Sequence, residues 1–316
     1  MNTKQTGQGY GYIPVAILCN ILWGSAIPFI NIGYRLFGIE SGGTGSQILF
    51  AGCRFFLAGW VTLLIRTVSL KRPALPKRGN AGMVLKLAAV QTVGQYVLFY
   101  IGVAHTISVK ASIIQGLGAF VSILIASFIF RYETMDRTKW IGGALGILGV
   151  IVMNWRSGSF GGGLSLFGEG ALVLSMISCA FSAGMIKKYG QKEDPVTLNG
   201  WQFVVGGAVM IVIGLLCRGQ LHPQGGTAYL VMLYLVMLSA VAYSLWSMLL
   251  KTYPISKIAV FMFLQPLFGV ILGILLVKQK PDTSPVQYAA ALTLVCACII
   301  VINSAGESSA PEGDGQ

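Results

Sequence analysis

Ten apolar stretches of about 20 residues follow one another along the chain, and they limit its fold more than any other feature. A helix needs about 20 predominantly apolar residues to cross the hydrocarbon core of a bilayer. Hydrophobic residues make up 55% of the 316 residues and charged residues only 10%, against roughly a quarter in soluble proteins. The sequence therefore predicts an all-α integral membrane protein with ten transmembrane helices. Their approximate limits are Tyr12 to Leu36, Ser46 to Arg66, Met83 to His105, Val109 to Phe130, Thr138 to Asn154, Leu164 to Ile186, Thr197 to Leu216, Gly226 to Leu250, Ile258 to Val277 and Val286 to Asn303.

The basic residues predict how these helices are oriented. With the N-terminus inside, the inner loops and ends hold fifteen Lys and Arg residues and the outer ones hold six. This is the bias of the positive-inside rule, so both termini are predicted to be cytoplasmic. The densest basic run, "RTVSLKRPALPKR", contains two prolines and no aromatic residue, which favours a topology-setting loop over a site for nucleic acid. The first stretch is too long for a signal-peptide core, and we expect it to remain as a helix.

The two halves of the chain match each other in pieces. "GCRFFLAGWV" from Gly52 matches "GWQFVVGGAV" from Gly200, which sets Arg54 opposite Gln202. "IIQGLGAFVSIL" matches "FLQPLFGVILGIL", which sets Gln115 opposite Gln265. The fifth and tenth stretches also agree. The match predicts two repeats of five helices each.

Five is an odd number, so the second repeat must enter the membrane from the opposite side to the first. The repeats are therefore predicted to be inverted, an arrangement found in secondary transporters, whose substrate site lies near the midplane. We expect the first repeat over 12–154, the second over 164–304 and a cytoplasmic tail over 305–316, with the glycine-rich segment Asn154 to Gly163 as linker.

Several of these segments together resemble the drug/metabolite transporter superfamily, in its ten-helix EamA-type branch. They are "LWGSAIPF" in the first stretch, "RFFLAG" in the second, "FRYE" after the fourth and "IGGALGILGV" in the fifth. The resemblance covers about residues 12 to 304. The second copy departs from the pattern, with Gln202 in place of the arginine and "VKQK" in place of "FRYE". The resemblance implies a multi-pass carrier, and export as its direction.

The first stretch carries polar and helix-weakening residues in its middle. Gly24 and Pro28 weaken a helix and predict a kink. Non-helical backbone in a membrane is tolerated where it is buried in protein or lines a wet cavity. We therefore expect Asn20, Trp23 and Ser25 to face an interior path, with close helix packing at Gly24 and Ser25 as the alternative.

Arg54 lies about 12 Å deep in its predicted helix, at 1.5 Å per residue from Ser46. An intramembrane charge is a candidate functional group. Its guanidinium could hold a carboxylate or phosphate at two points. The resemblance implies that arginine at this position is shared by carriers of very different substrates, which favours bracing of helix ends and backbone carbonyls over substrate binding.

The other intramembrane polar candidates are amides, hydroxyls and aromatic residues. Gln91 and Gln95 are four residues apart, as are Gln95 and Phe99, so they share a helix face, and Tyr243 and Trp246 form a similar face on the matched helix. Such groups suit small amphipathic or zwitterionic solutes better than multiply charged ones. For each glutamine an interhelical hydrogen bond is the alternative. The full set of candidates is Asn20, Trp23, Ser25, Arg54, Gln91, Gln95, Tyr96, Gln115, Ser182, Gln202, Tyr243, Trp246 and Gln265.

The acidic residues all fall in loops, tails or at the edges of the apolar stretches. The proton-coupled mechanism that relies on a carboxylate buried in mid-membrane is therefore not expected, and facilitated diffusion, exchange or a relay from an edge group such as Glu169 remain as alternatives. His105 and His222 are far apart in the sequence. No metal-ligand spacing, nucleophile elbow or phosphate-binding loop occurs in it. We expect no enzyme activity, no cofactor and no metal.

The sequence thus predicts a plasma-membrane carrier that exports small metabolites, such as amino acids or amphipathic compounds, by alternating access. A small-molecule substrate and the lipid bilayer are its expected partners, without nucleic acid. A non-transporting scaffold or assembly factor is the alternative outside transport, and a nucleotide-sugar-like carrier the alternative within it. The latter would need a clearly cationic pocket, for which one deep arginine is thin support.

Overall fold

The computed structural model describes residues 11–40, 42–77, 79–106, 108–155, 165–277 and 284–304, without the side chains of 108–110, 112, 276 and 277. The described residues form ten long helical segments, as predicted. In chain order they are α1 (Tyr12–Leu36); α2 (Thr44–Leu70); α3 (Ala81–Leu87) with η1 (Ala88–Gly94) and α4 (Gln95–Ala104); α5 (Ser108–Leu124) with η2 (Ile125–Ile129); α6 (Arg137–Asn154); η3 (Leu166–Gly170) with α7 (Ala171–Tyr189); α8 (Pro195–Leu216); α9 (Gly225–Thr252); α10 (Ile255–Ala259) with η4 (Val260–Phe263) and α11 (Leu264–Val277); and α12 (Pro285–Ser304).

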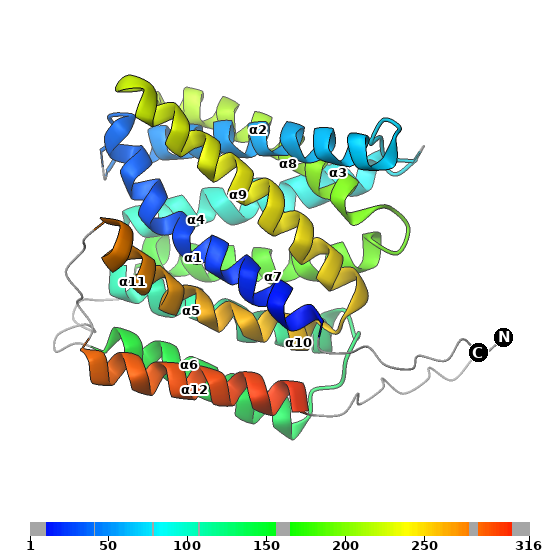
Figure 1. Cartoon of the computed structure of the whole chain (residues 1–316), viewed down its shortest axis with the longest axis vertical. Helices are drawn as coiled ribbons and strands as arrows, with labels where there is room; N and C mark the ends of the chain where they lie inside the picture. The colour runs from blue at the N-terminus through cyan, green and yellow to red at the C-terminus, as the bar shows by residue number, and fades with distance from the viewer. Residues whose placement is uncertain are drawn as a thin grey trace.

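Their length and composition suit a membrane. In the described ranges, eight of the segments are long and apolar enough to cross it, and Ile113–Ile129 is a shorter apolar helix. The segment α6 begins with Arg137 and Lys139, which lowers its hydropathy, yet it packs along α12. The two form the lowest layer in Figure 1, opposite α2 and α8 at the top.

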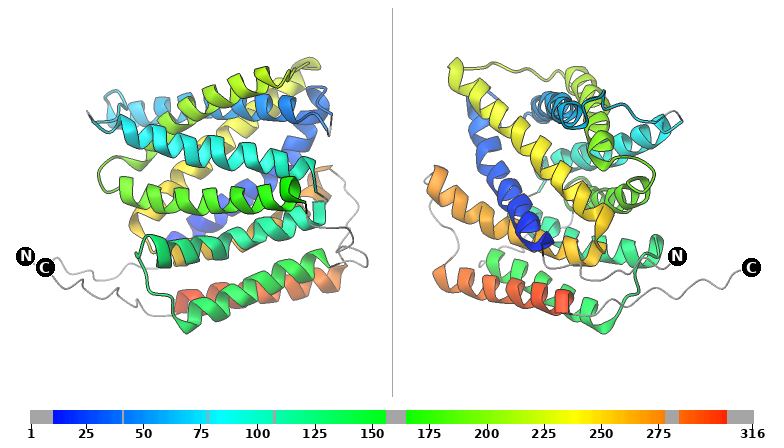
Figure 2. Two further views of the ribbon diagram at one scale, coloured as in Figure 1. Left: turned by 180° about the vertical axis from the view of Figure 1, so that it is seen from behind. Right: turned by 45° about the vertical axis from the view of Figure 1, so that its right-hand side comes forward.

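The contacts between helices repeat when the two halves are exchanged. The first-half helix α1 packs on α9 and α11, and its counterpart α7 packs on α4 and α5. The segment α2 meets its own counterpart α8, and α6 meets α12. Successive spans run in alternating directions (Figures 1 and 2). The prediction of two inverted five-helix repeats is thus confirmed.

The pair α2 and α8 lies so close that glycines on each helix touch the backbone of the other. A Cβ atom on Gly59 would come within 2.6 Å of the Val204 nitrogen, and one on Gly207 within 2.4 Å of the Phe56 nitrogen. Small residues permit this approach in membranes, where packing, interhelical hydrogen bonds and lipid entropy drive helix association. Gly59 and Gly207 are separated by the same 148 positions as the matched residues Arg54 and Gln202, so the crossing obeys the repeat.

The described ends of the chain meet on one side of the bundle, which we name the terminal side. There the Tyr12 hydroxyl donates to Asn303 Oδ1 at 2.6 Å. The opposite side, where α6 ends and the sixth span begins, is named the linker side. Residues 156–164, which hold most of the predicted linker, and the predicted tail 305–316 lie outside the described residues.

Candidate functional site

A cavity of about 490 Å³ lies between the two repeats. Its size falls in the usual range for small-molecule sites. Both repeats contribute to its wall, from α1, α2, α4, α5 and α6 in the first and α7, α9, α10 and α11 in the second. The lining includes ten of the residues singled out by the sequence, namely Trp23, Arg54, Gln91, Gln95, Tyr96, Gln115, Ser182, Tyr243, Trp246 and Gln265.

Three candidates lie away from this lining and bond to the protein instead. Asn20 Nδ2 donates to the Ala16 carbonyl at 2.7 Å. The Ser25 hydroxyl pairs with Leu22 O and, at 2.6 Å, with the Tyr234 hydroxyl. Gln202 is fully buried and its Oε1 accepts from Thr92 Oγ1 at 2.5 Å. Each side chain thus makes a local or interhelical hydrogen bond.

The first helix continues without a break through Gly24 and Pro28, from Tyr12 to Leu36. A Cβ atom on Gly24 would approach Phe268 Cβ to 2.6 Å and the Gly269 nitrogen to 3.0 Å. Gly24 therefore allows α1 and α11 to pack closely, while its neighbour Trp23 lines the cavity.

Arg54 projects from α2 into the cavity wall and is only 4% exposed. Its Cζ atom lies 4.3 Å from the centroid of the Phe55 ring and 6.0 Å from that of Tyr96. These are cation–π contacts, which stabilise a guanidinium without neutralising it. Its Nε atom has no hydrogen-bond partner in the described part of the chain. The Nε atom of Arg54 therefore makes no hydrogen bond to a helix end or a backbone carbonyl among the described residues.

Aromatic side chains also form part of the wall. The Trp23 ring lies 4.9 Å from Trp246 and 5.2 Å from Tyr243, centroid to centroid, both edge-on. The Tyr243 hydroxyl is hydrogen-bonded to that of Tyr96. A cluster of rings with polar edges suits a solute that has an apolar body and a polar group.

Two glutamines enter the wall from the third span, where the helix changes its winding. Gln91 lies in the π-helical turn η1 and Gln95 begins α4. Wider π turns often occur at functional sites. Thr92, between them, faces the other way and bonds to Gln202. The turn thus directs the amides to the cavity and the hydroxyl to α8.

Several polar atoms on these lining side chains are buried without a partner. They are Trp23 Nε1, Arg54 Nε, Gln91 Oε1 and Gln95 Oε1. Each buried polar atom left unpaired costs about 1–3 kcal/mol. Four such atoms gather on the wall of one cavity, while others, such as Asn20 Oδ1 and Ser247 Oγ, lie away from it.

The cavity is closed towards the terminal side and open towards the linker side. At the terminal end its wall consists of buried residues, including Ile186, Leu250 and Ile255. At the linker end the lining residues Ile27, Asn31 and Ile274 are exposed. The structure therefore shows the state that opens to the linker side.

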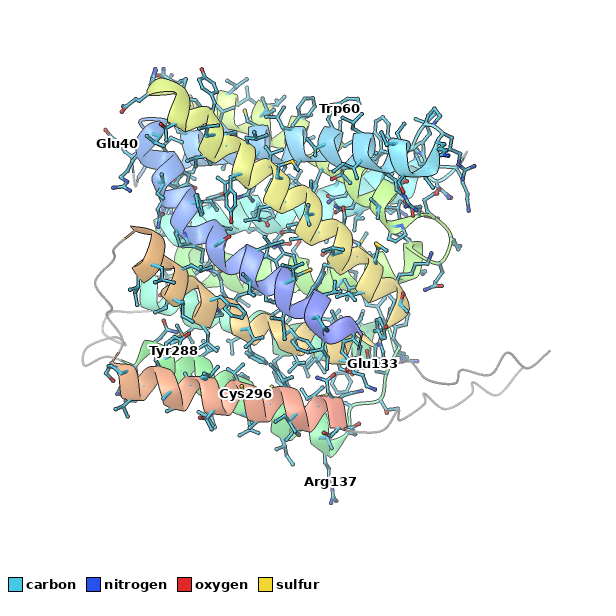
Figure 3. The ribbon with its side chains drawn as sticks, in the orientation of Figure 1. Glu40, Trp60, Glu133, Arg137, Tyr288 and Cys296 are labelled. Carbon is cyan, nitrogen blue, oxygen red and sulfur yellow. The ribbon has the colours of Figure 1, made fainter. Side chains whose placement is uncertain are left out.

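A buried carboxylate holds the closed end together. Glu133, labelled in Figure 3, accepts from the Ser256 nitrogen at 3.1 Å and from its hydroxyl. Lys139 Nζ lies 3.1 Å from the same carboxylate and donates to Thr134 O at 2.6 Å. This network connects the loop after the fourth span to the first turn of α10.

On the linker side Glu169 makes a comparable link. Its Oε1 accepts from the Thr106 hydroxyl at 2.8 Å, and its Oε2 accepts from the Ser165 nitrogen at 2.8 Å. Thr106 and Ser256 are 150 positions apart, as are Gln115 and Gln265, so the two carboxylates hold matched starts of helices on opposite sides.

The cavity also contains residues that the sequence analysis did not select. Asn31 lies eight residues after Trp23, Ser239 four before Tyr243, and Cys179 three before Ser182. These are spacings of one helix face. Extending each chosen face by one or two turns would have found all three. Within the described ranges, no three His, Cys, Asp or Glu side chains lie together as metal ligands do.

Known proteins resemble this chain in sequence and in fold. The EamA-like transporter family matches residues 11–155 and 166–303. A WAT1-related chloroplastic protein of Arabidopsis thaliana is 26% identical over 248 residues, which cover 75% of this chain and 59% of that protein. The uncharacterized transporter YvbV of Bacillus subtilis is 22% identical over 270 residues, 84% of this chain and 86% of that protein.

A solved crystal structure shares the fold, with a TM-score of 0.73 at 15% identity, over 91% of this chain and 98% of the other. The two family matches together cover nearly all of the described residues, and they divide where the structure divides into repeats. The chain belongs to the EamA-like transporter family of the drug/metabolite transporter superfamily and is a multi-pass membrane transporter.

Proposed function

We propose that the protein is a plasma-membrane carrier that exports small metabolites, such as amino acids or amphipathic compounds, by alternating access. The observation that carries this proposal is the group of unpartnered polar atoms on Trp23, Arg54, Gln91 and Gln95, all on the wall of one cavity. A scaffold or assembly factor would have no use for such atoms, because their burial destabilises the fold. A bound solute would satisfy them.

The state of the two ends supports alternating access. A carrier must expose its site to one side at a time, and here the terminal side is closed while the linker side is open. The carboxylates Glu133 and Glu169 hold matched helix starts on opposite sides. We infer that release of the Glu133 network accompanies opening to the terminal side.

The basic residues support the orientation. The excess of Lys and Arg supports cytoplasmic termini, and in that orientation the open linker side faces outward. Export follows from the family resemblance, as does the bacterial-type plasma membrane, which the Bacillus relative supports. A nucleotide-sugar-like carrier is disfavoured because Arg54 supplies the single cation among the described lining residues.

The test is a transport screen with the purified full chain in liposomes, against amino acids and cationic dyes. The variants Gln95→Ala and Trp246→Ala remove an amide and a ring from the wall. Thr293→Ala, on the exposed face of α12, is the matched control. We expect flux of at least one solute, reduced in both wall variants and unchanged in the control.

Two results would count against the proposal in different ways. If every solute class fails to cross and none changes the melting temperature, the carrier function is wrong. If flux occurs and neither wall variant alters it, the carrier function stands and the cavity is not its path.

A further inference from the structure

The cavity wall carries a single charge. Among the described lining residues Arg54 is the one ionised side chain, and none is Asp, Glu, Lys or His. The carboxylates Glu133 and Glu169 are engaged at the two ends and are not part of the lining. The described cavity wall therefore holds one positive charge and no counter-charge.

A buried cation is unfavourable unless it is paired or bonded. The two rings beside Arg54 contact its face, and its Nε atom has no hydrogen-bond partner among the described residues. A ligand with one negative charge would make the loaded site neutral. A dianion would leave it negative, and an uncharged or zwitterionic ligand would leave it positive.

Other groups on the cavity wall favour the same charge because they can donate hydrogen bonds. Tyr96 and Tyr243 share one hydrogen bond between two hydroxyls, so one of the two protons is left to donate elsewhere. The indole nitrogen of Trp23 is a donor without a partner. Oxygens of a carboxylate or sulfonate accept such bonds, and a planar guanidinium binds them at two points.

From this charge and these donors we propose that the substrate is an amphipathic monoanion, whose acidic group binds Arg54 and whose apolar body lies against Trp23 and Trp246. The inference rests on the proposed carrier function and narrows it. A mid-membrane carboxylate for proton exchange is absent from the described lining. The substrate therefore crosses with its own charge, as an electrogenic uniport.

Such a carrier needs no coupling ion for export. A membrane potential that is negative inside drives an anion outward, and 100 mV corresponds to an equilibrium concentration ratio of about fiftyfold for one charge. The membrane potential thus favours export of an anion, which is the direction that the family resemblance implies.

The test compares four probes that share a phenyl ring and differ in charge. They are 2-phenylethanesulfonate as a permanent monoanion, 3-phenylpropanamide as a neutral compound, phenylalanine as a zwitterion and 2-phenylethyl phosphate as a multiply charged anion. Binding is measured by calorimetry and thermal shift on the purified full chain. Flux is measured in liposomes with a potassium diffusion potential set by valinomycin.

We expect the sulfonate to bind most tightly and to cross faster when the receiving compartment is positive. Arg54→Gln should weaken its binding at least thirtyfold, because it removes one partner of a buried charge pair. Arg54→Lys should restore part of the affinity, since lysine keeps the charge and loses the planar fork. Thr293→Ala should behave as the wild type.

Equal binding of the amide and the sulfonate, or tighter binding of the zwitterion or the phosphate, would overturn the inference. So would sulfonate flux that ignores the potential, or binding that Arg54→Gln leaves unchanged. In those cases the carrier function survives, because a solute still binds or crosses. If none of the four probes binds, the monoanion inference is wrong, and the wider solute screen decides separately whether the carrier function fails with it.

Discussion

The two repeats use one matched position in opposite ways. Arg54 of the first repeat lines the cavity and finds no hydrogen-bond partner at its Nε atom among the described residues. Its counterpart Gln202 is fully buried, accepts from Thr92 and donates to Asn199 Oδ1 at 3.2 Å. Five residues further along each helix, the matched glycines Gly59 and Gly207 behave alike.

The two repeats thus share the same residue at the glycine position and differ at the polar position. The close crossing of α2 and α8 needs the same small residues on both helices, because each backbone rests on the other. The polar position beside the crossing can differ between the repeats, because Arg54 lines the cavity and Gln202 bonds to a neighbouring helix. Five variants test this comparison.

The largest effect is expected where the repeats agree. Gly59→Ala and Gly207→Ala should each lower the free energy of unfolding by about 2–3 kcal/mol, because the new methyl group meets backbone atoms that cannot move aside. Thermal unfolding in detergent and the yield of monodisperse protein measure the loss. Gly82→Ala is the control and should not destabilise, because a Cβ atom there would meet no other part of the described chain within 4 Å. A large difference between the two crossing variants would break the symmetry argument.

A smaller loss is expected at Gln202. Gln202→Leu leaves the Thr92 hydroxyl and Asn199 without their partner in a dry interface, which costs about 1–3 kcal/mol. The matched control is Gln95→Leu, whose Oε1 has no partner to lose. We expect Gln202→Leu to lower the melting temperature and to leave solute affinity unchanged. Lost affinity at normal stability would place Gln202 in the site instead.

The helix starts at Ser46 and Asp194 give a third comparison. Asp194 begins α8, accepts from the Thr197 nitrogen at 2.8 Å and pairs with both Nε and Nη2 of Arg66, the latter at 2.6 Å. The matched Ser46 hydroxyl makes a neutral bond from the Gln220 nitrogen at 3.0 Å. Partial burial raises the pKa of Asp194, but the bonds from Arg66 and Thr197 outweigh it and hold the pKa below its usual value.

A carboxyl whose pKa is lowered by folding stabilises the protein above its unfolded pKa of about 3.9. That contribution is lost as the pH falls through the lower folded value. Asp194→Asn should therefore lower stability by about 1 kcal/mol at pH 7 and by less as the solution is acidified. Melting curves across this range, with Ser46→Ala as the neutral control, measure the difference. A loss that does not change with pH would mean that the charge of Asp194 contributes nothing.

The smallest effect on stability is expected at Arg54. Arg54→Met removes a cation–π contact of about 0.5–2 kcal/mol and also removes a charge that is unfavourable to bury. We expect the free energy of unfolding to change by no more than about 1 kcal/mol. Chemical unfolding in mixed micelles would measure it. A collapse in the amount of folded protein would show that Arg54 braces the helices.

The helices could be predicted closely from the sequence because the requirement for about 20 apolar residues fixes each span. The inverted repeat followed from the odd number of helices per half. The site was harder. Ser25 lies two residues from Trp23, which turns it to another face of α1, and Asn20 lies on the closed side of the bundle, where helices fill the space.

Gln202 could not have been separated from Arg54 by pattern alone. The repeat aligns the two residues. In the structure Gln202 faces Thr92, which belongs to η1, whereas Arg54 faces the cavity. The π turn that creates this division depends on the packing of the third span, and "AAVQTVG" gives no local sign of it.

The lone arginine has a consequence for how such a protein can be built. If two identical halves formed the same bundle, each residue near the axis would occur twice, so the site would hold two arginines or none. Two guanidiniums in one cavity would repel each other and would select a doubly charged ligand. Joining the halves in one chain lets them diverge while they stay paired, so the site can hold an odd number of charges, which two identical halves cannot provide.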